Sequence, residues 1–234
     1  MDRKMAALVL GLILLAIGIY FYSSRGNQTT VLDTMKIEVI AENGTSVATL
    51  EPKTPLSIVA IFGSKSMDIT NYFLYTGTYY YFKFSPVVKP TFTAQGTVKI
   101  KYDITWEYLT YAGQAHPEVY RLSRIAQAEG KITLPYTASV EISNPTSGQP
   151  TTISDMAAVI IAKITNVMQK PDVGASYDLK GRLTVVATLY VNGVAQGSPL
   201  KQSADFIVTI KNQPDGVLSA IDVSVDVGTA QAMW

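Results

Sequence analysis

Apolar and polar residues alternate along much of the chain, as they do in β-strands that bury one face. Segment 97–106 has the clearest pattern: its odd positions carry charged or hydroxyl residues, and its even positions carry Val98, Ile100, Tyr102, Ile104 and Trp106. Successive side chains of a strand point to opposite faces of the sheet. This spacing therefore predicts a half-buried antiparallel strand.

Two Asn-Gly pairs lie beside alternating segments. Segments 35–42 and 45–50 flank Asn43-Gly44, and segment 183–191 runs into Asn192-Gly193. Asn and Gly both tolerate the positive φ that a two-residue hairpin turn requires. We therefore predict a β-hairpin at each pair.

Further short apolar runs predict more strands, and Gly, Asn and Pro separate them. These runs cover 56–62, 79–84, 131–143, 205–211 and 217–227, whereas 119–128 fits either a strand or a helix. Pro135 interrupts one run and indicates a sheet edge or a bulge. This spacing predicts a mainly β fold, an antiparallel β-sandwich of the immunoglobulin-like type, formed as one domain by residues 31–234.

One segment has helical periodicity instead. Between Ser154 and Pro171 the apolar residues follow a helical stripe made of Met156, Ile160, Ile164 and Val167. Ser154 suits an N-cap, Asp155 suits the positive end of a helix, and Pro171 would end it. We therefore predict one amphipathic helix at about 155–170, packed on a sheet.

The N-terminal region contains a predicted membrane anchor. Residues 5–22 are eighteen residues without a charge, a length that just crosses a thin bilayer core as a helix. The run ends in the aromatic residues Tyr20, Phe21 and Tyr22, which suit a membrane–water interface. The short arm 1–4 carries Arg3 and Lys4, so we place it in the cytoplasm. Residues 23–30 are polar and form a predicted stalk.

Three interpretations of this apolar segment stay open. No small-residue cleavage site follows it, which favours an uncleaved signal anchor in the plasma membrane with the bulk of the chain extracytoplasmic. A cleaved signal peptide is the second reading. The third is a pilin-type leader cut between Lys4 and Met5, although Lys4 is not the small residue that such a cut usually follows.

Composition excludes several classes of protein. The chain has 234 residues, of which 47% are hydrophobic and 16% charged, with a formal net charge of +1, no Cys and one His. The charge gives no footprint for nucleic acid. The absence of Cys rules out disulfides and thiolate chemistry, and a single His rules out a multi-histidine metal site.

The candidate chemistry is sparse. His116 stands in a loop-like setting without a recognisable nucleophile, and Ser198-x-x-Lys201 matches a catalytic motif only formally. Asp222 and Asp226 suit either a Ca²⁺ site or, more simply, a solvated strand face. We therefore expect no enzymatic activity, no catalytic residue, no metal and no cofactor.

Two other kinds of site are candidates. Tyr79 and Tyr81 share one face of segment 79–84, where they would form either an exposed contact surface or a cross-strand aromatic pair that stabilises the sheet. Asn27 and Asn43 each begin an N-x-[ST] sequence and are candidate glycosylation sites.

The order of elements over residues 31–227 resembles a known family. It runs from Tyr75-Thr-Gly-Thr through strands at 79–86, 97–106 and 132–140 to the amphipathic segment and the hairpin at 192–193. This pattern is similar to membrane-anchored archaeal β-rich ectodomains that are sometimes encoded beside signal peptidase. Members of that family often carry a second, C-terminal span, and none follows here. The resemblance implies an archaeal envelope and carries over no catalytic residue.

These observations give one leading functional hypothesis. We expect a single-pass cell-envelope structural or assembly protein, held in lipid by residues 5–22, which contacts a protein partner or copies of itself. Strand-edge pairing is one route, with 31–39 as a donated strand. The alternatives are an accessory subunit of a membrane enzyme such as signal peptidase, and a pilin-like filament subunit.

Overall fold

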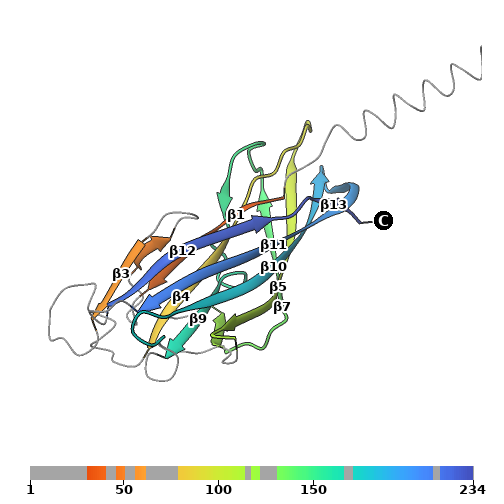
Figure 1. Cartoon of the computed structure of the whole chain (residues 1–234). Helices are drawn as coiled ribbons and strands as arrows, with labels where there is room; N and C mark the ends of the chain where they lie inside the picture. The colour runs from red at the N-terminus through yellow and green to blue at the C-terminus, as the bar shows by residue number, and fades with distance from the viewer. Residues whose placement is uncertain are drawn as a thin grey trace, which may run out of the picture.

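A computed structural model describes residues 31–40, 46–50, 56–61, 79–113, 117–121, 131–165, 171–212 and 217–233. Within these ranges only the backbone is described at 40, 46–48, 56–61, 79–81, 164–165 and 217–222. All of the elements found in these ranges are strands (Figure 1).

The described strands form two antiparallel sheets. The smaller sheet has the order β2 (Ser46–Leu50), β1 (Leu32–Ile40), β4 (Tyr79–Val88), β9 (Ile160–Thr165) and β6 (Glu118–Arg121), with β8 (Thr151–Thr152) paired to β4. The larger sheet has the order β3 (Leu56–Ile61), β12 (Val217–Val227), β11 (Val194–Asn212), β10 (Ser176–Val191), β5 (Val98–Tyr111) and β7 (Tyr136–Ser143). A short strand, β13 (Gln231–Ala232), pairs with β11.

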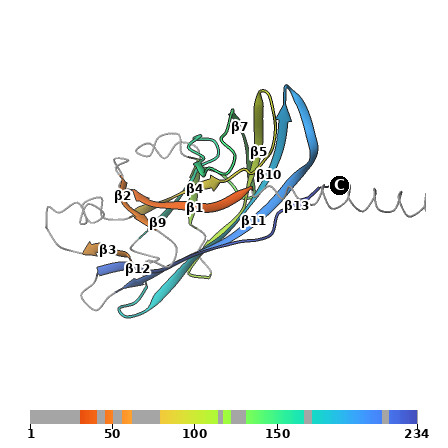
Figure 2. The ribbon, with the colours of Figure 1, turned by 90° about the horizontal axis from the view of Figure 1, so that it is seen from above.

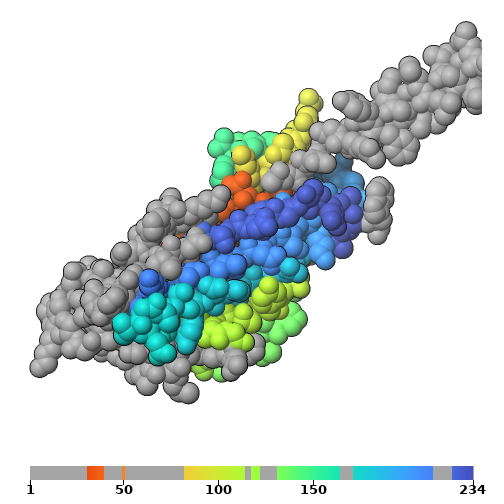
Figure 3. All heavy atoms as spheres, in the orientation of Figure 1, coloured from red at the N-terminus to blue at the C-terminus, as the bar shows by residue number. Residues whose placement is uncertain are grey.

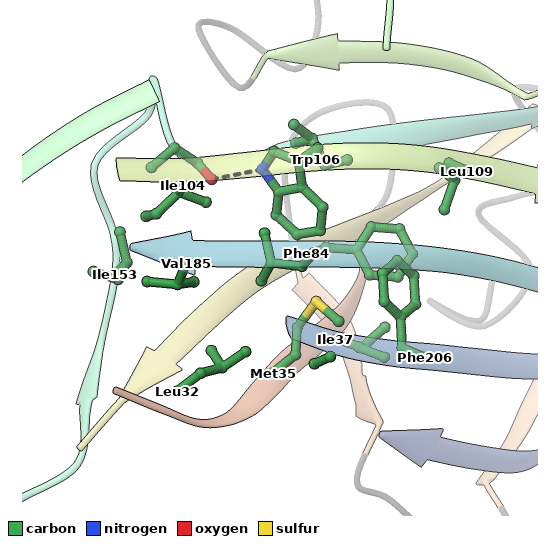
Figure 4. Close-up of a cluster of buried hydrophobic side chains, with 14 of the residues drawn as sticks. Leu32, Met35, Ile37, Phe84, Ile104, Trp106, Leu109, Ile153, Val185 and Phe206 are labelled. Carbon is green, nitrogen blue, oxygen red and sulfur yellow. Dashed lines mark hydrogen bonds between the residues drawn. The ribbon is translucent and has the colours of Figure 1, made fainter. Parts of the chain in front are cut away.

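The two sheets pack face to face and enclose one hydrophobic core (Figure 2). Trp106 on β5 and Phe206 on β11 meet Phe84 on β4, with ring centroids 5.0–6.3 Å apart. The indole Nε1 of Trp106 donates a hydrogen bond to the carbonyl of Ala158 at 3.1 Å, which ties the larger sheet to the chain that precedes β9 (Figure 4). The predicted mainly β, two-sheet sandwich is confirmed, and its immunoglobulin-like type stays a prediction.

Strand β5 shows why the alternating pattern was informative. Its even residues from Val98 to Trp106 are buried, as predicted, and the odd residues between them are not. At Glu107 and Tyr108 two consecutive residues are exposed, because Trp106 pairs with Leu183 and Tyr108 with Arg182. Glu107 is therefore the extra residue of a β-bulge, which restores the inward direction at Leu109 and Tyr111.

Both predicted hairpins are supported by strand pairing. Val191 pairs with Val194 across Asn192 and Gly193, whose φ angles of 50° and 82° are those of a type I′ turn. Strands β1 and β2 pair antiparallel on either side of Asn43-Gly44, and that turn itself lies outside the described residues.

The helix predicted at 155–170 is wrong. The side chain of Asp155 accepts a hydrogen bond from the Ala157 amide, and its carbonyl accepts one from Ala158, which makes a turn. Strand β9 follows, and residues 166–170 lie outside the described part. Val159–Ala162 are at most 2% exposed, so this apolar run, three of whose residues are β-branched, is buried on both faces. A short run of this kind lacks the alternation that distinguishes a strand from a helix.

In the described part of the chain no helix is long and apolar enough to be a membrane span. The predicted anchor 5–22 and stalk 23–30 fall outside that part.

Candidate contact surfaces

The first described residues are held by a buried glutamine. The amides of Val31 and Leu32 both donate to the side-chain Oε1 of Gln202, at 3.1 and 2.7 Å. The Nε2 of Gln202 donates to the carbonyl of Gly228 at 2.6 Å. Gln202 is only 6% exposed and lies on β11, so it joins the start of the domain to the segment that follows β12. We call this arrangement the Gln202 clamp.

Four segments meet at the end of the sandwich that carries the clamp. They are 89–97, 144–152, 192–199 and 228–233, and we call them together the neutral end. Asn192 donates its amide to the Thr97 carbonyl at 2.8 Å, and its side chain accepts from the Thr97 amide at 3.0 Å. The Met233 amide donates to the Pro199 carbonyl at 2.8 Å. The hairpin tip is therefore hydrogen-bonded to the loop before β5, and the last described residues are hydrogen-bonded to β11 at Pro199, several residues from the tip.

The fourth segment joins the same end through another set of hydrogen bonds. The Phe92 amide donates to the Ser147 hydroxyl at 2.9 Å, and this hydroxyl donates to the Phe92 carbonyl at 2.8 Å. The Gly148 amide donates to the Pro90 carbonyl at 2.7 Å. These contacts tie segments 89–97 and 144–152 into one unit.

The composition of the neutral end differs from that of the chain as a whole. Lys89 is the one charged residue in its four segments, and most of the others are Thr, Gln, Ser, Asn, Gly, Pro and Ala. Two large apolar side chains are exposed there, Val194 at 64% and Met233 at 44%. Charged residues adjoin these segments on the strands: Lys99 stands two residues after Thr97 on β5, and Lys201 stands two residues after Pro199 on β11.

The outer face of the larger sheet, on which β11, β10 and β5 lie side by side in Figure 3, is a separate surface. Arg182 makes a two-pronged salt bridge to Asp205 at 2.8 and 2.9 Å. Lys99 pairs with Glu141 at 2.9 Å. Hydroxyl groups also pair across strands on this face, and these pairs are Thr105 with Thr137 at 2.9 Å and Thr184 with Ser203 at 2.7 Å. Charges held in pairs and hydroxyl pairs are typical of a solvated sheet face.

These pairs determine the electrostatics of that face. The hydrogen bond from Arg182 holds the pKa of the Asp205 carboxyl below its ordinary value. Burial alone would raise the pKa of Asp103, but hydrogen bonds from Ser139 and Lys101 outweigh burial and lower it. Both carboxylates therefore stay ionised at neutral pH and are neutralised by a partner in the same sheet.

The outer face of the smaller sheet holds a buried carboxylate. Glu38 on β1 accepts a hydrogen bond from Lys83 on β4 at 2.8 Å and lies 3.2 Å from the ammonium of Lys36. Burial of Glu38 would raise its pKa, but hydrogen bonds from Lys83 and Lys36 lower it further than burial raises it. Tyr120, on β6, donates to Glu118 at 2.9 Å on the same sheet.

The predicted tyrosines lie in β4, a central strand of this sheet. Tyr81 is opposite Ile40 on one side and Lys163 on the other, and Tyr79 is opposite Thr165. Their positions alternate along β4 with that of the buried Phe82. The exposed contact surface and the cross-strand aromatic pair both stay predictions, because the side chains of Tyr79 and Tyr81 lie outside the described part of the structure.

Other predicted positions lie outside the described residues. They are the glycosylation candidates Asn27 and Asn43, the membrane-interface residues Tyr20, Phe21 and Tyr22, and the loop histidine His116.

The remaining motif candidates lie on strands. Ser198 and Lys201 are both on β11, not at the start of a helix. The backbone of Asp226 pairs with that of Asp205, and its side chain is exposed. Among the described residues, no three of His, Cys, Asp and Glu are close enough together to hold a metal ion.

Sequence reasoning missed the Gln202 clamp, although the pattern contained a signal for it. The inward-facing positions of β11 include Ala204, Phe206 and Val208, and Gln202 is the polar member of this series. A buried polar side chain in an apolar row is normally hydrogen-bonded, which makes such a residue a candidate structural contact.

A scan against protein-family models, a search of curated proteins and a search of solved structures each found no match to this chain.

Proposed function

We propose that the protein is a single-pass, membrane-anchored component of the cell envelope, with its sandwich outside the cytoplasm. Its role is structural: the sandwich contacts other envelope proteins or further copies of itself and carries out no catalysis. The anchor is the uncharged run at 5–22, and the positive arm before it sets the orientation.

The observation that carries this proposal is the Gln202 clamp. It holds Val31 and Leu32 by hydrogen bonds, and eight residues, 23–30, separate Val31 from the last residue of the apolar run. A pull on the N-terminal side of the chain is therefore resisted by hydrogen bonds to β11, a central strand of the larger sheet. Such an attachment suits a domain that is tethered through its N-terminus.

The strand pairing shows which surfaces of the domain remain available for contact with another protein. The segment considered as a donated strand, 31–39, contributes β1, which lies between β2 and β4 of its own domain with a buried inner face. We therefore do not propose strand donation. On the outer face of the larger sheet Arg182 is paired with Asp205 and Lys99 with Glu141, which leaves the sheet edges as the better contact sites.

Edge strand β7 fits this role best. It has eight residues, against four in β6 at the edge of the smaller sheet. One face of β7 packs Ala138 into the core with Val140 and Ile142 beside it, and Glu141 is its one charged residue. A long edge with little charge is suited to pairing with a strand from another chain.

The test is extraction of the native protein in mild detergent, followed by sizing and mass spectrometry. Repeated self-contacts, or a complex with other envelope proteins, are the expected result. One membrane enzyme at a fixed ratio would instead indicate an accessory subunit, and a lone monomer would contradict the proposal. N-terminal sequencing completes the test: a start after residue 22 refutes the anchor, and a start at Met5 or Ala6 indicates a pilin-like subunit.

A further inference from the structure

We infer that the neutral end rests on the lipid headgroups of the membrane, so that the sandwich stands upright with its opposite end away from the bilayer. This inference rests on the proposed function, because it requires the anchor at 5–22. The folded loops of the neutral end would then make a second contact with the membrane, in addition to that of the apolar run.

The length of the stalk supports this orientation. Eight residues, 23–30, separate the apolar run from Val31, which the Gln202 clamp holds near Gly228, in one of the four segments of the neutral end. Fully extended they span at most about 28 Å, and as a flexible chain they span on the order of 15 Å. The neutral end is therefore the part of the domain that the tether keeps closest to the membrane.

The chemistry of this end suits a headgroup layer. A charged side chain loses solvation as it approaches a medium of low dielectric constant, whereas hydroxyl, amide and backbone groups can exchange water for headgroup oxygens. The four segments present these uncharged groups, and Lys89 has a stem long enough to reach a phosphate. The exposed side chains of Val194 and Met233 can bury apolar area between headgroups.

The loops are also held together before any contact is made. Hydrogen bonds join the hairpin turn to Thr97, the loop at Phe92 to Ser147, and Met233 to Pro199. A preorganised surface loses little conformational freedom on binding. A short tether also raises the effective concentration to the millimolar range, so even a weak affinity suffices to keep this surface on the membrane.

The structure offers a matched reference point at the other end of the same hairpin. Val173 is 63% exposed, against 64% for Val194, and it pairs with Asn212 beside the start of β10. The sixteen residues of β10 separate the two ends by about 50 Å if the strand is extended. An upright domain brings Val194 to the membrane and leaves Val173 far from it, whereas a domain lying flat brings both close.

The test uses the absence of Cys from the chain, which makes single-cysteine labelling specific. Full-length Val194→Cys and Val173→Cys variants carry the same fluorophore and are reconstituted in phosphatidylcholine vesicles that contain a headgroup-nitroxide lipid. Flotation of the vesicles after alkaline washing reports separately on the anchor. Quenching of each label by the nitroxide reports on the distance of each end from the headgroups.

The expected result is quenching several-fold stronger at position 194 than at 173, with the protein floating in both cases. Equal quenching, or stronger quenching at 173, in floating vesicles overturns the inference and leaves the anchor standing. Failure to float overturns the proposed function and the inference together. Quenching at 194 that needs anionic lipid and disappears in high salt also overturns it, because a neutral surface requires neither.

A second pair of variants separates contact from mere proximity. A label at Gln196→Cys, on the same exposed hairpin tip, is read with and without Val194→Asp. A new carboxylate in the headgroup layer should reduce quenching at 196 several-fold, and Val173→Asp should leave it unchanged. No response to Val194→Asp would show that the tip lies near the membrane without touching it, which overturns the inference.

Discussion

Replacing Gln202 by Ala tests whether the clamp stabilises the domain. The substitution removes three hydrogen bonds, two accepted from the amides of Val31 and Leu32 and one donated to Gly228. A neutral hydrogen bond contributes about 1 kcal/mol net, and a buried amide left without a partner costs on the order of 1–3 kcal/mol. Water can reach part of this end of the domain, so we expect a loss of about 2–4 kcal/mol from the free energy of unfolding.

The measurement is guanidinium unfolding of the full chain in detergent, followed by tryptophan fluorescence, to which the buried Trp106 contributes. Gln196→Ala is the matched control, because Gln196 is an exposed glutamine of the same strand whose side chain donates to the nearby Val194 carbonyl. We expect this control to change stability by less than about 0.5 kcal/mol. Amide hydrogen exchange adds a local readout, in which Val31 and Leu32 lose protection in Gln202→Ala alone.

Gln202→Glu refines the test. A glutamate keeps an acceptor for Val31 and Leu32 but, when ionised, turns a carboxylate toward the Gly228 carbonyl, where the glutamine donates. Burial and this repulsion should raise the folded-state pKa of the new carboxyl above the ordinary glutamate value. The variant should therefore recover stability as the pH falls through that raised pKa. Equal stability of Gln202→Ala and Gln196→Ala would refute the clamp as a source of stability.

Three further predictions concern the core and the buried charge, and the same unfolding assay tests them. Gly181→Ala should cost about 1–3 kcal/mol, because its Cβ would overlap the Phe206 ring, and Phe206→Leu should relieve part of that loss. Tyr102→Phe should raise stability by about 1 kcal/mol, since the hydroxyl is buried with no hydrogen-bond partner in the described part of the chain. A loss of stability would show instead that this hydroxyl has a hydrogen-bond partner. Glu38 has a lowered pKa, so its contribution is full above its ordinary pKa of 4.5 and disappears as the pH falls through the lowered value. Glu38→Gln should destabilise at neutral pH and weaken the acid dependence, whereas the exposed Glu141→Gln should do neither.

The alternating segments could be predicted from sequence because local geometry determines their pattern. Strand β5 has one buried and one polar face, and a period of two identifies such a strand without knowledge of its neighbours. The turn at Asn192-Gly193 was equally local, since two residues with positive φ suffice to define it.

Two elements could not be predicted in this way. Strand β9 is buried on both faces, so its apolar run has no alternation to separate it from a helix. Strand β11 was expected only from residue 205, whereas it begins at Val194. Residues 197–199, which include Gly197 and Pro199, oppose only Thr188 on β10, because Ala187 pairs with Leu200 and Leu189 with Gln196. This bulge has the composition of a loop, and the sequence pattern alone does not distinguish the two.

The neutral end could not be predicted from the sequence for a different reason. Its four segments are separated by tens of residues, and each one by itself is typical of a polar loop. Only the strand pairings bring them together, because Leu32 lies opposite Val88 and Val98 opposite Val191. A shared property such as the near absence of charge becomes visible only after these non-local contacts are known.

The polar faces and the edges of the sheets now suggest how contacts are divided over the molecule. On the larger sheet, Arg182 and Asp205 neutralise each other, so a partner docking on this face would have to separate or desolvate them. An edge carries no such penalty, because a new strand satisfies backbone groups that water otherwise satisfies. Strand β7 is an edge of this sheet, and the neutral end lies at one end of the same sandwich. A domain standing on that end would hold β7 upright, where neighbouring copies in one membrane can reach it side by side.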